Sequence, residues 1–365
     1  MYRVLTINPG STSTKVGYFE DNVRIFAVTA EHDAEVLKQF PSIVDQLPYR
    51  RQTILEALEG RPIDLEKLDA VVGRGGGLLP TSGGTYLVDD LLLDHATRGA
   101  NGVVHPAQLG AELAREFAEP CHAQVFVVNP PDVDELQETA RMTGVRGIYR
   151  QSHIHALNQK ETAIRHADLM GRSYEDCNFI VCHIGGGLSV AAHRKGRMVD
   201  GNDIVCGEGP MAPTRCGALP AAALIRYCFS GVSEREALEL CTKRGGFVSH
   251  LDTADAKDVS SRAVAGERYP MLIWESMIYQ IVKYIGAMAC TLEGKVDGIL
   301  LGGGMVYNRD LVEKITDACR WIAPVTAYPG EFELEAMAAG AIRVLSGKEA
   351  AKHYTGAPVW QPPQI

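Results

Sequence analysis

Two arginines lie in segments of the sequence where a guanidinium could reach a bound anion. Arg74 is the charged residue of the run Gly-Arg-Gly-Gly-Gly at 73–77, and Arg215 stands in the run Pro-Thr-Arg-Cys-Gly at 213–217. A guanidinium is a planar fork of donors that binds a carboxylate or a phosphate with two hydrogen bonds. The alternative is a solvated surface arginine, but small or rigid neighbours favour a role in anion binding.

Glycine-rich turns follow apolar, strand-like segments at three places, and each could present backbone N–H groups to phosphate oxygens. The turns and their hydroxyl residues are Gly10, Ser11, Thr12 and Ser13; Gly185, Gly186, Gly187 and Ser189; and Gly302, Gly303 and Gly304. Each turn by itself could be an ordinary tight turn. A P-loop and a dinucleotide fingerprint are both excluded, because a strand-like segment follows the first two turns where those motifs need a helix.

The sequence pattern repeats, which predicts a duplicated α/β fold. Segments 5–13 and 181–189 both read as strand, polar residue, glycine turn, hydroxyl residue and strand, and strand-to-glycine units at 68–77 and 296–304 follow in the same order. A chain of 365 residues suits two domains. We expect domains at 1–150 and 151–334, the first completed by the C-terminal segment 335–365. Helices are predicted at 34–39, 51–58, 107–117, 134–142, 336–345 and 349–353.

Composition excludes several classes of protein. The net charge of −9 and the lack of a basic run argue against nucleic-acid binding. No apolar run is long enough for a membrane span, and we expect no signal peptide, because the sequence opens on a strand-like pattern. The nine cysteines include no Cys-x-x-Cys pair, so we expect reduced thiols and a cytoplasmic protein.

Two long segments carry a resemblance to a known family. Residues 5–15 read Leu-Thr-Ile-Asn-Pro-Gly-Ser-Thr-Ser-Thr-Lys and resemble the first signature of the acetate and butyrate kinases. Residues 179–196, with His-x-Gly-x-Gly-x-Ser at 183–189, are similar to the second signature, and the runs 152–160 and 328–331 resemble the butyrate kinase versions. The resemblance implies the ribonuclease H-like fold of actin, sugar kinases and Hsp70, with ATP in a cleft between two domains, and it implies a homo-oligomer.

The resemblance also implies roles for individual residues. Arg74 and Arg215 would hold the carboxylate and the transferring phosphoryl group, and His155 would stabilise the pentacoordinate phosphorus. His153 makes a His-x-His pair with His155, but two ligands without a third nearby do not make a metal site. The residues expected to bind ATP or ADP are Asn8, Gly10, Ser11, Thr12, Ser13, Lys15, His183, Gly185, Gly186, Gly187, Ser189, Gly302, Gly303 and Gly304.

The magnesium site has one preferred ligand and one departure from the family pattern. Glu331 matches a family carboxylate that holds Mg²⁺, with Glu333 and Asp132 as alternatives. Asn129 stands where the family pattern has an aspartate, which would remove one charge from the site. The alternative for Glu331 and Glu333 is an acid that stabilises a helix N-terminus.

The expected acceptor is a carboxylate, which is ionised at neutral pH and needs no general base. A sugar or glycerol kinase would need an aspartate base, which the first glycine turn lacks. Butyrate is favoured because glycines at 75 and 76 replace the valines that follow the arginine in acetate kinases. Acetate, propionate and branched acids remain alternatives, since one methylene is worth only ~1–3 kcal/mol; so does a non-catalytic ATP-binding module. The residues expected to line the acyl pocket are Gly75, Gly76, Val104, His105, Ile154 and Met211, of which the valine, isoleucine and methionine could equally belong to the core.

Overall fold

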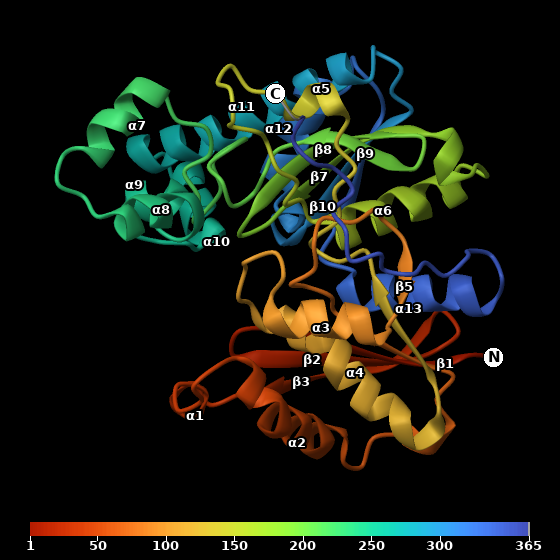
Figure 1. The fold of residues 1–365 in the computed structure, drawn as a ribbon. Helices are drawn as coiled ribbons and strands as arrows, with labels where there is room; N and C mark the ends of the chain where they lie inside the picture. Colours follow the sequence, from red (N-terminus) through yellow and green to blue (C-terminus); the bar gives the residue numbers. More distant parts are fainter. Residues whose placement is uncertain (364–365) are drawn as a thin grey trace. The chain divides into compact units, whose positions relative to one another are not determined.

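A computed structural model of the chain, which describes residues 1–363, divides into two units (Figure 1). Unit 1 comprises Met1–Asp134 and the C-terminal segment that begins at Phe332, and unit 2 comprises Glu135–Glu331. The division therefore lies at 134/135, where the sequence suggested 150. Glu135 belongs to unit 2 because its carboxylate accepts hydrogen bonds from the Lys160 ammonium at 2.8 and 3.0 Å and from the backbone N–H of Met198 at 2.8 Å.

Unit 1 is built on a six-stranded sheet with the order β3-β2-β1-β4-β6-β5. Its strands are β1 (Arg3–Pro9), β2 (Ser13–Glu20), β3 (Val23–Glu31), β4 (Ala70–Gly73), β5 (Thr85–Leu87) and β6 (Gln124–Val128). The first three strands form antiparallel hairpins, whereas β4 and β6 run parallel to β1. Both the Pro9 end of β1 and the Gly73 end of β4 therefore lie at the same edge of the sheet.

Helices pack against this sheet through apolar side chains. They are α2 (Leu47–Leu58), α3 (Asp90–Arg98), α4 (Gly110–Ala118) and α13 (Glu333–Leu345), with a 3₁₀ turn at Pro106–Leu109 before α4. The short helix α1 (Ala34–Leu37) has no buried residue. Leu5 and Ile7 of β1 share a core with Ile54 of α2 and Leu113 of α4. The C-terminal helix α13 packs on β1, β4 and β6, so the chain returns to unit 1 at its end.

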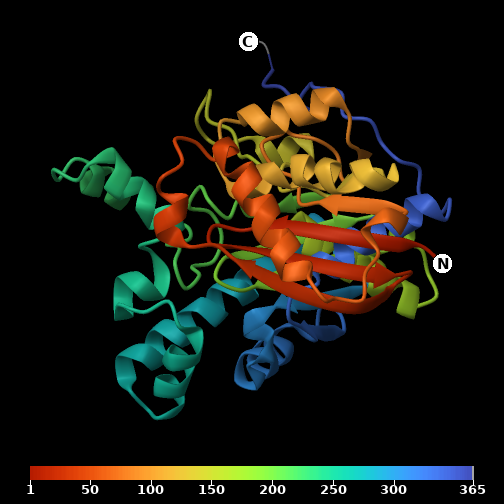
Figure 2. The same cartoon turned by 90° about the horizontal axis from the view of Figure 1, so that it is seen from below.

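Unit 2 is built on a five-stranded sheet with the order β11-β10-β7-β8-β9. The strands are β7 (Asn178–Ile184), β8 (Leu188–Arg194), β9 (Arg197–Gly201), β10 (Gly298–Gly303) and β11 (Val325–Pro329). The helices are α5 (Glu138–Arg141), α6 (Ala156–Leu169), α7 (Ala221–Cys228), α8 (Glu234–Thr242), α9 (Gly246–Leu251), α10 (Ala256–Val264), α11 (Arg268–Thr291) and α12 (Arg309–Cys319). Figure 2 shows α7 projecting from the rest of this unit, and none of its residues is buried.

The two sheets share one topology. In unit 1 the order β3-β2-β1-β4-β6 joins an antiparallel three-stranded meander to two parallel strands, and β9-β8-β7-β10-β11 does the same in unit 2. This correspondence confirms the duplicated α/β fold predicted from the repeated strand and glycine-turn pattern.

Two predicted helices are wrong. In the segment 134–142 only Glu138–Arg141 is helical, because Asp134 N–H bonds the Thr81 carbonyl at 2.7 Å in an extended conformation. The segment 349–353 is also extended: Lys352 N–H donates to the Thr85 carbonyl at 2.8 Å, and the Lys352 carbonyl accepts from Leu87 N–H at 2.9 Å. Among residues 1–363, no helix combines the length and the apolar character needed to cross a membrane.

Candidate active site

The first glycine loop joins β1 to β2 and is closed by a hydrogen bond from Gly10 N–H to the Ser13 carbonyl at 2.7 Å. Asn8 on β1 lies opposite Lys15 on β2 in the antiparallel register, and Ser11, Thr12 and Lys15 are exposed. The structure therefore brings the predicted residues of this loop together at one end of a hairpin, with their polar groups accessible to a ligand.

Arg50 of α2 is hydrogen-bonded to the backbone of this loop. Its side chain is fully buried (0% exposed), and its Nη1 and Nη2 donate to the Gly10 and Ser11 carbonyls at 2.9 and 3.2 Å. The remaining acceptors of this guanidinium in the described chain are the Gln46 amide oxygen and the Thr14 hydroxyl, so every bonded partner is neutral. Burial lowers the pKa of Arg50 to about 10, yet the group stays a cation near neutral pH. Its positive charge lies behind the loop without a bonded anion and favours anion binding there.

Sequence reasoning missed Arg50, although a signal was present. Arg50, Ile54 and Leu58 are spaced four residues apart, and all three are buried on one face of α2. A charged residue at a position of the apolar face requires a polar partner inside the fold. That spacing could have marked Arg50 as a residue with a structural or functional role.

The second glycine loop joins β7 to β8 and holds Arg215 against it. Gly185 N–H donates to the Gly187 carbonyl at 3.0 Å, which closes the turn. A Cβ atom on Gly187 would overlap the Arg215 guanidinium, so glycine is required for this close approach. The Nε and Nη1 atoms of Arg215 are buried and have no hydrogen-bond partner among the described residues. Because buried donors are almost always satisfied, this guanidinium is suited to receive an anionic ligand.

His155 lies at the same loop, twenty-eight residues before His183 in the chain. It is the N-cap residue of α6, its Nδ1 is 2.8 Å from the Ser189 hydroxyl, and its ring stacks on that of His183 with centroids 4.0 Å apart. The structure thus gathers the predicted His155, His183, Ser189 and Arg215 around one glycine turn of unit 2.

A hydrogen-bond chain behind Ser189 orients His155. The Tyr174 hydroxyl lies 2.7 Å from His193 Nδ1, and His193 Nε2 lies 2.9 Å from Gln159 Oε1. Gln159 Nε2 in turn donates to the Ser189 hydroxyl oxygen at 2.7 Å. Burial lowers the pKa of His193 far below its ordinary value, so this ring is neutral. If the Tyr174 hydroxyl donates to His193 Nδ1, then His193 Nε2–H donates to Gln159 and the Gln159 amide donates to Ser189. The Ser189 O–H is then left to donate to His155 Nδ1. The proton of a neutral His155 then resides on Nε2.

Arg74 follows β4 in unit 1 and lies close to several other predicted residues. Its Nη1 donates to the Asn129 carbonyl at 3.4 Å, burial lowers its pKa, and the carboxylates of Glu333 and Asp132 oppose that decrease. Burial lowers the pKa of His105, and the charge of Arg74 lowers it further. These groups lie near the end of β4, so the predicted set of unit 1 also gathers in one place.

The third glycine run spans the end of β10 and borders an open groove. Gly303 has a left-handed φ of 99° and exchanges two backbone hydrogen bonds with Gly330 at 2.9 and 3.1 Å. Gly304 lines a groove of about 880 Å³ together with residues of α10, α11 and α12, among them Ser260, Trp274 and Arg309. Ligand sites commonly have volumes of about 300–1,000 Å³.

Comparisons with known proteins identify the family of this chain. The acetokinase family model matches residues 140–322. The chain is 45% identical to a probable butyrate kinase of Clostridium botulinum over 97% of its own length and 99% of that protein, and 44% identical to butyrate kinase 1 of Clostridium acetobutylicum over 97% and 100%. The chain belongs to the acetokinase family.

Solved structures show the fold of this acetokinase-family chain. It matches Porphyromonas gingivalis acetate kinase with a TM-score of 0.77 at 19% identity, covering 95% of this chain and 100% of that one. A propionate kinase of Francisella tularensis matches with a TM-score of 0.72 at 16% identity over 93% and 99%. The predicted actin-like, ribonuclease H-like fold is confirmed by these likenesses.

The acetokinase-family chain uses the glycines after Arg74 for packing. A Cβ on Gly75 would overlap the Val127 side chain and lie 2.8 Å from that of Pro130, and one on Gly76 would lie 3.2 Å from the backbone nitrogen of Gln108. The expectation that these glycines leave extra room for an acyl chain is therefore wrong on the side where a Cβ would project. Their backbone contact with a substrate stays a prediction.

The other predicted pocket residues fall into three environments. Val104 is exposed (74%). Ile154 is buried, and Met211 belongs to the main apolar core of unit 2. For Ile154 and Met211 this is the alternative in which the side chain belongs to the core. His105 accepts a hydrogen bond from Ala107 N–H at 3.1 Å and caps the 3₁₀ turn that follows it. A role for any of these four side chains in acyl-chain recognition stays a prediction.

The candidate carboxylates differ in their partners. A Glu331 oxygen lies 3.8 Å from His183 Nε2, beside the second glycine loop. Glu333 instead accepts a hydrogen bond from the Asn8 side chain at 2.7 Å. Asp132 accepts from the Asn101 side chain at 2.6 Å, but its second oxygen is buried without a hydrogen-bond partner among the described residues, and burial raises its pKa to about 6.

Asn129, the departure from the family pattern, has a structural task. It has a left-handed φ of 38°, and its side-chain oxygen accepts from Gly84 N–H at 2.8 Å. Asparagine tolerates this backbone conformation better than most residues do. The side chain therefore supports the turn that follows β6.

Proposed function

We propose that the protein is a short-chain fatty acid kinase that transfers the γ-phosphoryl group of ATP to a carboxylate, with butanoate as its preferred acceptor. The products are ADP and an acyl phosphate. The observation that carries the proposal is the half-buried Arg215 side chain, whose buried Nε and Nη1 atoms lack hydrogen-bond partners among the described residues and which packs against Gly187.

These residues fit phosphoryl transfer to an anion. A carboxylate nucleophile is already ionised, so the enzyme's task is to stabilise the charge of the transferring phosphoryl group. Arg215 supplies fixed positive charge, and His155 supplies a donor from Nε2. We assign Arg74 the same kind of task toward the acceptor carboxylate, since it lies among glycines near the neutral His105 and its charge is compensated only by nearby carboxylates.

The proposal also assigns residues of each unit to the nucleotide and the metal. We assign ATP phosphates to the glycine loops at 10–13 and 185–187, and the adenosine to the groove at Gly304. Glu331 fits a magnesium ligand, since carboxylate oxygens suit Mg²⁺ and this one lies beside the second loop. Magnesium bound there would neutralise part of the phosphate charge. Glu333 fits less well, because Asn8 already occupies one of its oxygens.

Butanoate is preferred over other acceptors because the relatives at 44–45% identity are named butyrate kinases and match along nearly the whole chain. The test is acyl hydroxamate formation from ATP, Mg²⁺ and hydroxylamine with acetate, propionate, butanoate, isobutanoate and valerate. We expect the highest kcat/KM for butanoate. A higher kcat/KM for acetate would refute butanoate as the preferred acceptor but would still support kinase activity. Binding of ADP without formation of any hydroxamate would refute the kinase activity itself.

Arg215→Ala tests the role of the guanidinium. Loss of one preorganised charge donor typically lowers kcat by ~10²–10³-fold. Arg320→Ala, at an exposed arginine (72%) outside the proposed sites, is the matched control and should keep wild-type turnover. Activity of Arg215→Ala within a few-fold of wild type would contradict the assignment.

We also propose a cytoplasmic homo-oligomer. All nine cysteines are free thiols, which suits a reducing compartment. The helix α7 exposes Leu224, Ile225 and Tyr227, an apolar face that a second copy could cover. Light scattering after gel filtration should give at least a dimer mass, and Ile225→Lys should lower it.

A further inference from the structure

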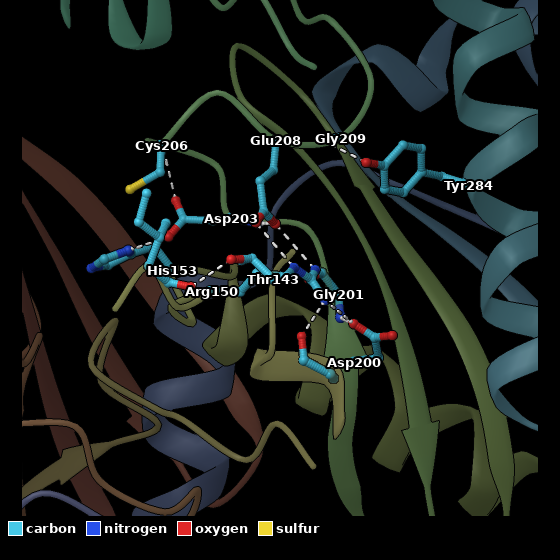
Figure 3. Close-up of polar contacts among 12 residues, drawn as sticks. Thr143, Arg150, His153, Asp200, Gly201, Asp203, Cys206, Glu208, Gly209 and Tyr284 are labelled. Carbon is cyan, nitrogen blue, oxygen red and sulfur yellow. Dashed lines mark hydrogen bonds and ion pairs between the residues drawn. The ribbon is translucent and has the colours of Figure 1, made fainter. Parts of the chain in front are cut away.

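A second group of chemically active side chains lies in unit 2, away from the glycine loop. Figure 3 shows His153 and Cys206 on either side of Asp203. One donor atom from each residue lies within 4.8 Å of the other two, and His153 Nδ1 is 2.6 Å from an oxygen of Asp203. The residues come from two segments, the one that leads into α6 and the loop after β9. A hydrogen bond from Ile204 N–H to the His153 carbonyl at 3.0 Å joins these segments.

The carboxylate of Asp203 is held in place before any ligand arrives. Its side chain is 1% exposed, and one oxygen accepts hydrogen bonds from Val205 N–H at 2.8 Å and Cys206 N–H at 3.0 Å. The other oxygen is thereby directed at His153. A buried carboxylate fixed by two backbone donors, with a histidine and a thiol beside it, is a preorganised set of oxygen, nitrogen and sulfur ligands.

Another carboxylate beside the cluster is already engaged. Glu208 accepts two hydrogen bonds from Arg150, at 3.0 and 3.1 Å, and one from the Asp203 backbone N–H at 3.1 Å, so both of its oxygens already have donors. The His153 side chain is 30% exposed and Cys206 is exposed, so solvent can reach the group from one side. The arrangement offers three protein ligands and one position for water.

The two histidines of the His-x-His pair do not share a metal site. His155 is directed toward Ser189 and His183, so it is not a partner of His153. The ligands that complete the set come from residues 203 and 206, about fifty positions further along the chain. The sequence-based conclusion that these two histidines do not bind a common metal is therefore unchanged. His153 instead belongs to a group with Asp203 and Cys206.

We propose that His153, Asp203 and Cys206 bind one thiophilic divalent metal ion, Zn²⁺ in its simplest form, with water as the fourth ligand. Thiolate and imidazole select Zn²⁺ over Mg²⁺, which prefers oxygen ligands. The site is therefore separate from the magnesium that the kinase reaction uses. Binding releases the Cys206 thiol proton and the proton between His153 and Asp203 to solvent. Metal bonds of ~2.0–2.3 Å require the His153–Asp203 contact to open by under ~1 Å.

The ion would fasten the loop after β9 to the segment that begins α6. His153 lies two residues before His155, and Cys206 lies nine residues before Arg215. The metal would thus stabilise the two segments that carry these active-site residues. It takes no part in the transfer itself.

Cobalt titration of the reduced, magnesium-free protein tests the site directly. Co²⁺ bound by a thiolate in a tetrahedral site gives a thiolate-to-metal charge-transfer band in the near ultraviolet and intense visible d–d bands. We expect both to saturate at one equivalent, to disappear on adding Zn²⁺ and to persist in excess Mg²⁺. Zn²⁺ should also slow alkylation of Cys206 by about tenfold or more, as mass spectrometry of its peptide measures.

Variants assign the ligands. Cys206→Ser should abolish the charge-transfer band, and His153→Ala should weaken binding of cobalt by about tenfold or more. Cys228→Ser and Cys290→Ser, at exposed cysteines elsewhere, are matched controls and should keep the band. Circular dichroism verifies that each variant is folded.

Three results would overturn the proposal: no band in folded wild-type protein at one equivalent, a band that survives in Cys206→Ser, or a band lost in Cys216→Ser instead. Each would leave the hydroxamate assay unchanged, so failure of the metal site and failure of the kinase are separate findings.

Discussion

Replacing Gln159 with leucine removes the central link of the hydrogen-bond chain that orients His155. Gln159 is 1% exposed and bridges two groups, with its Nε2 2.7 Å from the Ser189 hydroxyl and its Oε1 2.9 Å from His193 Nε2. Leucine has a similar volume, so the change deletes polar contacts and leaves little cavity. Without the donation from Gln159, the Ser189 hydroxyl is no longer committed to donating to His155, and His155 loses its preference for the Nε2–H tautomer.

The size of the effect follows from these contacts. Each buried hydrogen bond contributes about 1 kcal/mol net, and a buried N–H of His193 left without a partner costs about 1–3 kcal/mol, so the free energy of unfolding should fall by about 2–4 kcal/mol. For catalysis, a misdirected donor costs less than an absent one, and we expect kcat to fall by ~10–100-fold. The KM for ATP should rise as well, because Gln159 donates to the carbonyl and hydroxyl oxygens of Ser189, a residue expected to bind ATP.

The assay measures kcat and KM by hydroxamate formation and stability by urea denaturation. His166→Leu is the matched control. His166 lies on the same helix, and its hydrogen bond to the Tyr328 hydroxyl has a similar length (2.7 Å) but does not belong to the hydrogen-bond chain that orients His155. It should lower stability without lowering kcat. If Gln159→Leu lost stability but kept wild-type kcat at a temperature where both are folded, the orienting role of this chain would be refuted.

Three further predictions follow from single contacts. Arg50→Met removes the two hydrogen bonds to the first loop and should weaken ADP binding by about tenfold or more in calorimetry, whereas Arg51→Met, which removes an ion pair with Glu116 of α4 instead, should not. Lys160→Met removes the ammonium that compensates the charge of the buried Glu135 carboxylate and should lower the free energy of unfolding by about 3–5 kcal/mol in urea, with partial recovery when Glu135→Leu is added. Burial raises the pKa of Asp132 from 3.8 to about 6, so the folded state holds this proton more tightly than the unfolded state. The contribution of Asp132 to stability should therefore fall by up to about 3 kcal/mol as the pH rises from about 4 to about 6, and Asp132→Asn should lack this fall in urea midpoints measured at both pH values.

Each has a contradicting result. Unchanged ADP affinity in Arg50→Met would show that the loop keeps its shape without the guanidinium. A loss below about 1 kcal/mol in Lys160→Met would show that water reaches Glu135. If stability depended on pH equally in wild type and in Asp132→Asn, the decrease in stability with rising pH would belong to other carboxyl groups.

The sequence alone determined those features that arise from neighbouring residues. Both hairpins with their glycine turns, and the strand-to-glycine units that follow them, are local patterns, and their repetition was sufficient to predict the duplicated α/β fold. The family signatures around residues 5–15 and 179–196 also identified the glycine loops, and with them His183 and Ser189, because those residues are contiguous in the chain.

Only the tertiary structure decided which distant side chains meet. The predicted helix at 134–142 fails because Glu135 is bonded to Lys160 and Met198, and the one at 349–353 fails because the backbone of Lys352 pairs with β5. Such contacts override local helix propensity, since an unpaired buried carboxylate or backbone group costs more than propensity supplies.

The same reason separates the predicted from the unpredicted residues of the sites. Arg50 reaches the Gly10 loop from forty residues away, and Asp203 lies fifty residues from His153. Glycine at 75 reads from sequence as free space, but Val127 and Pro130 fill it. Local sequence sets backbone conformation, whereas the filling of space and the pairing of buried charge depend on which segments the fold brings into contact.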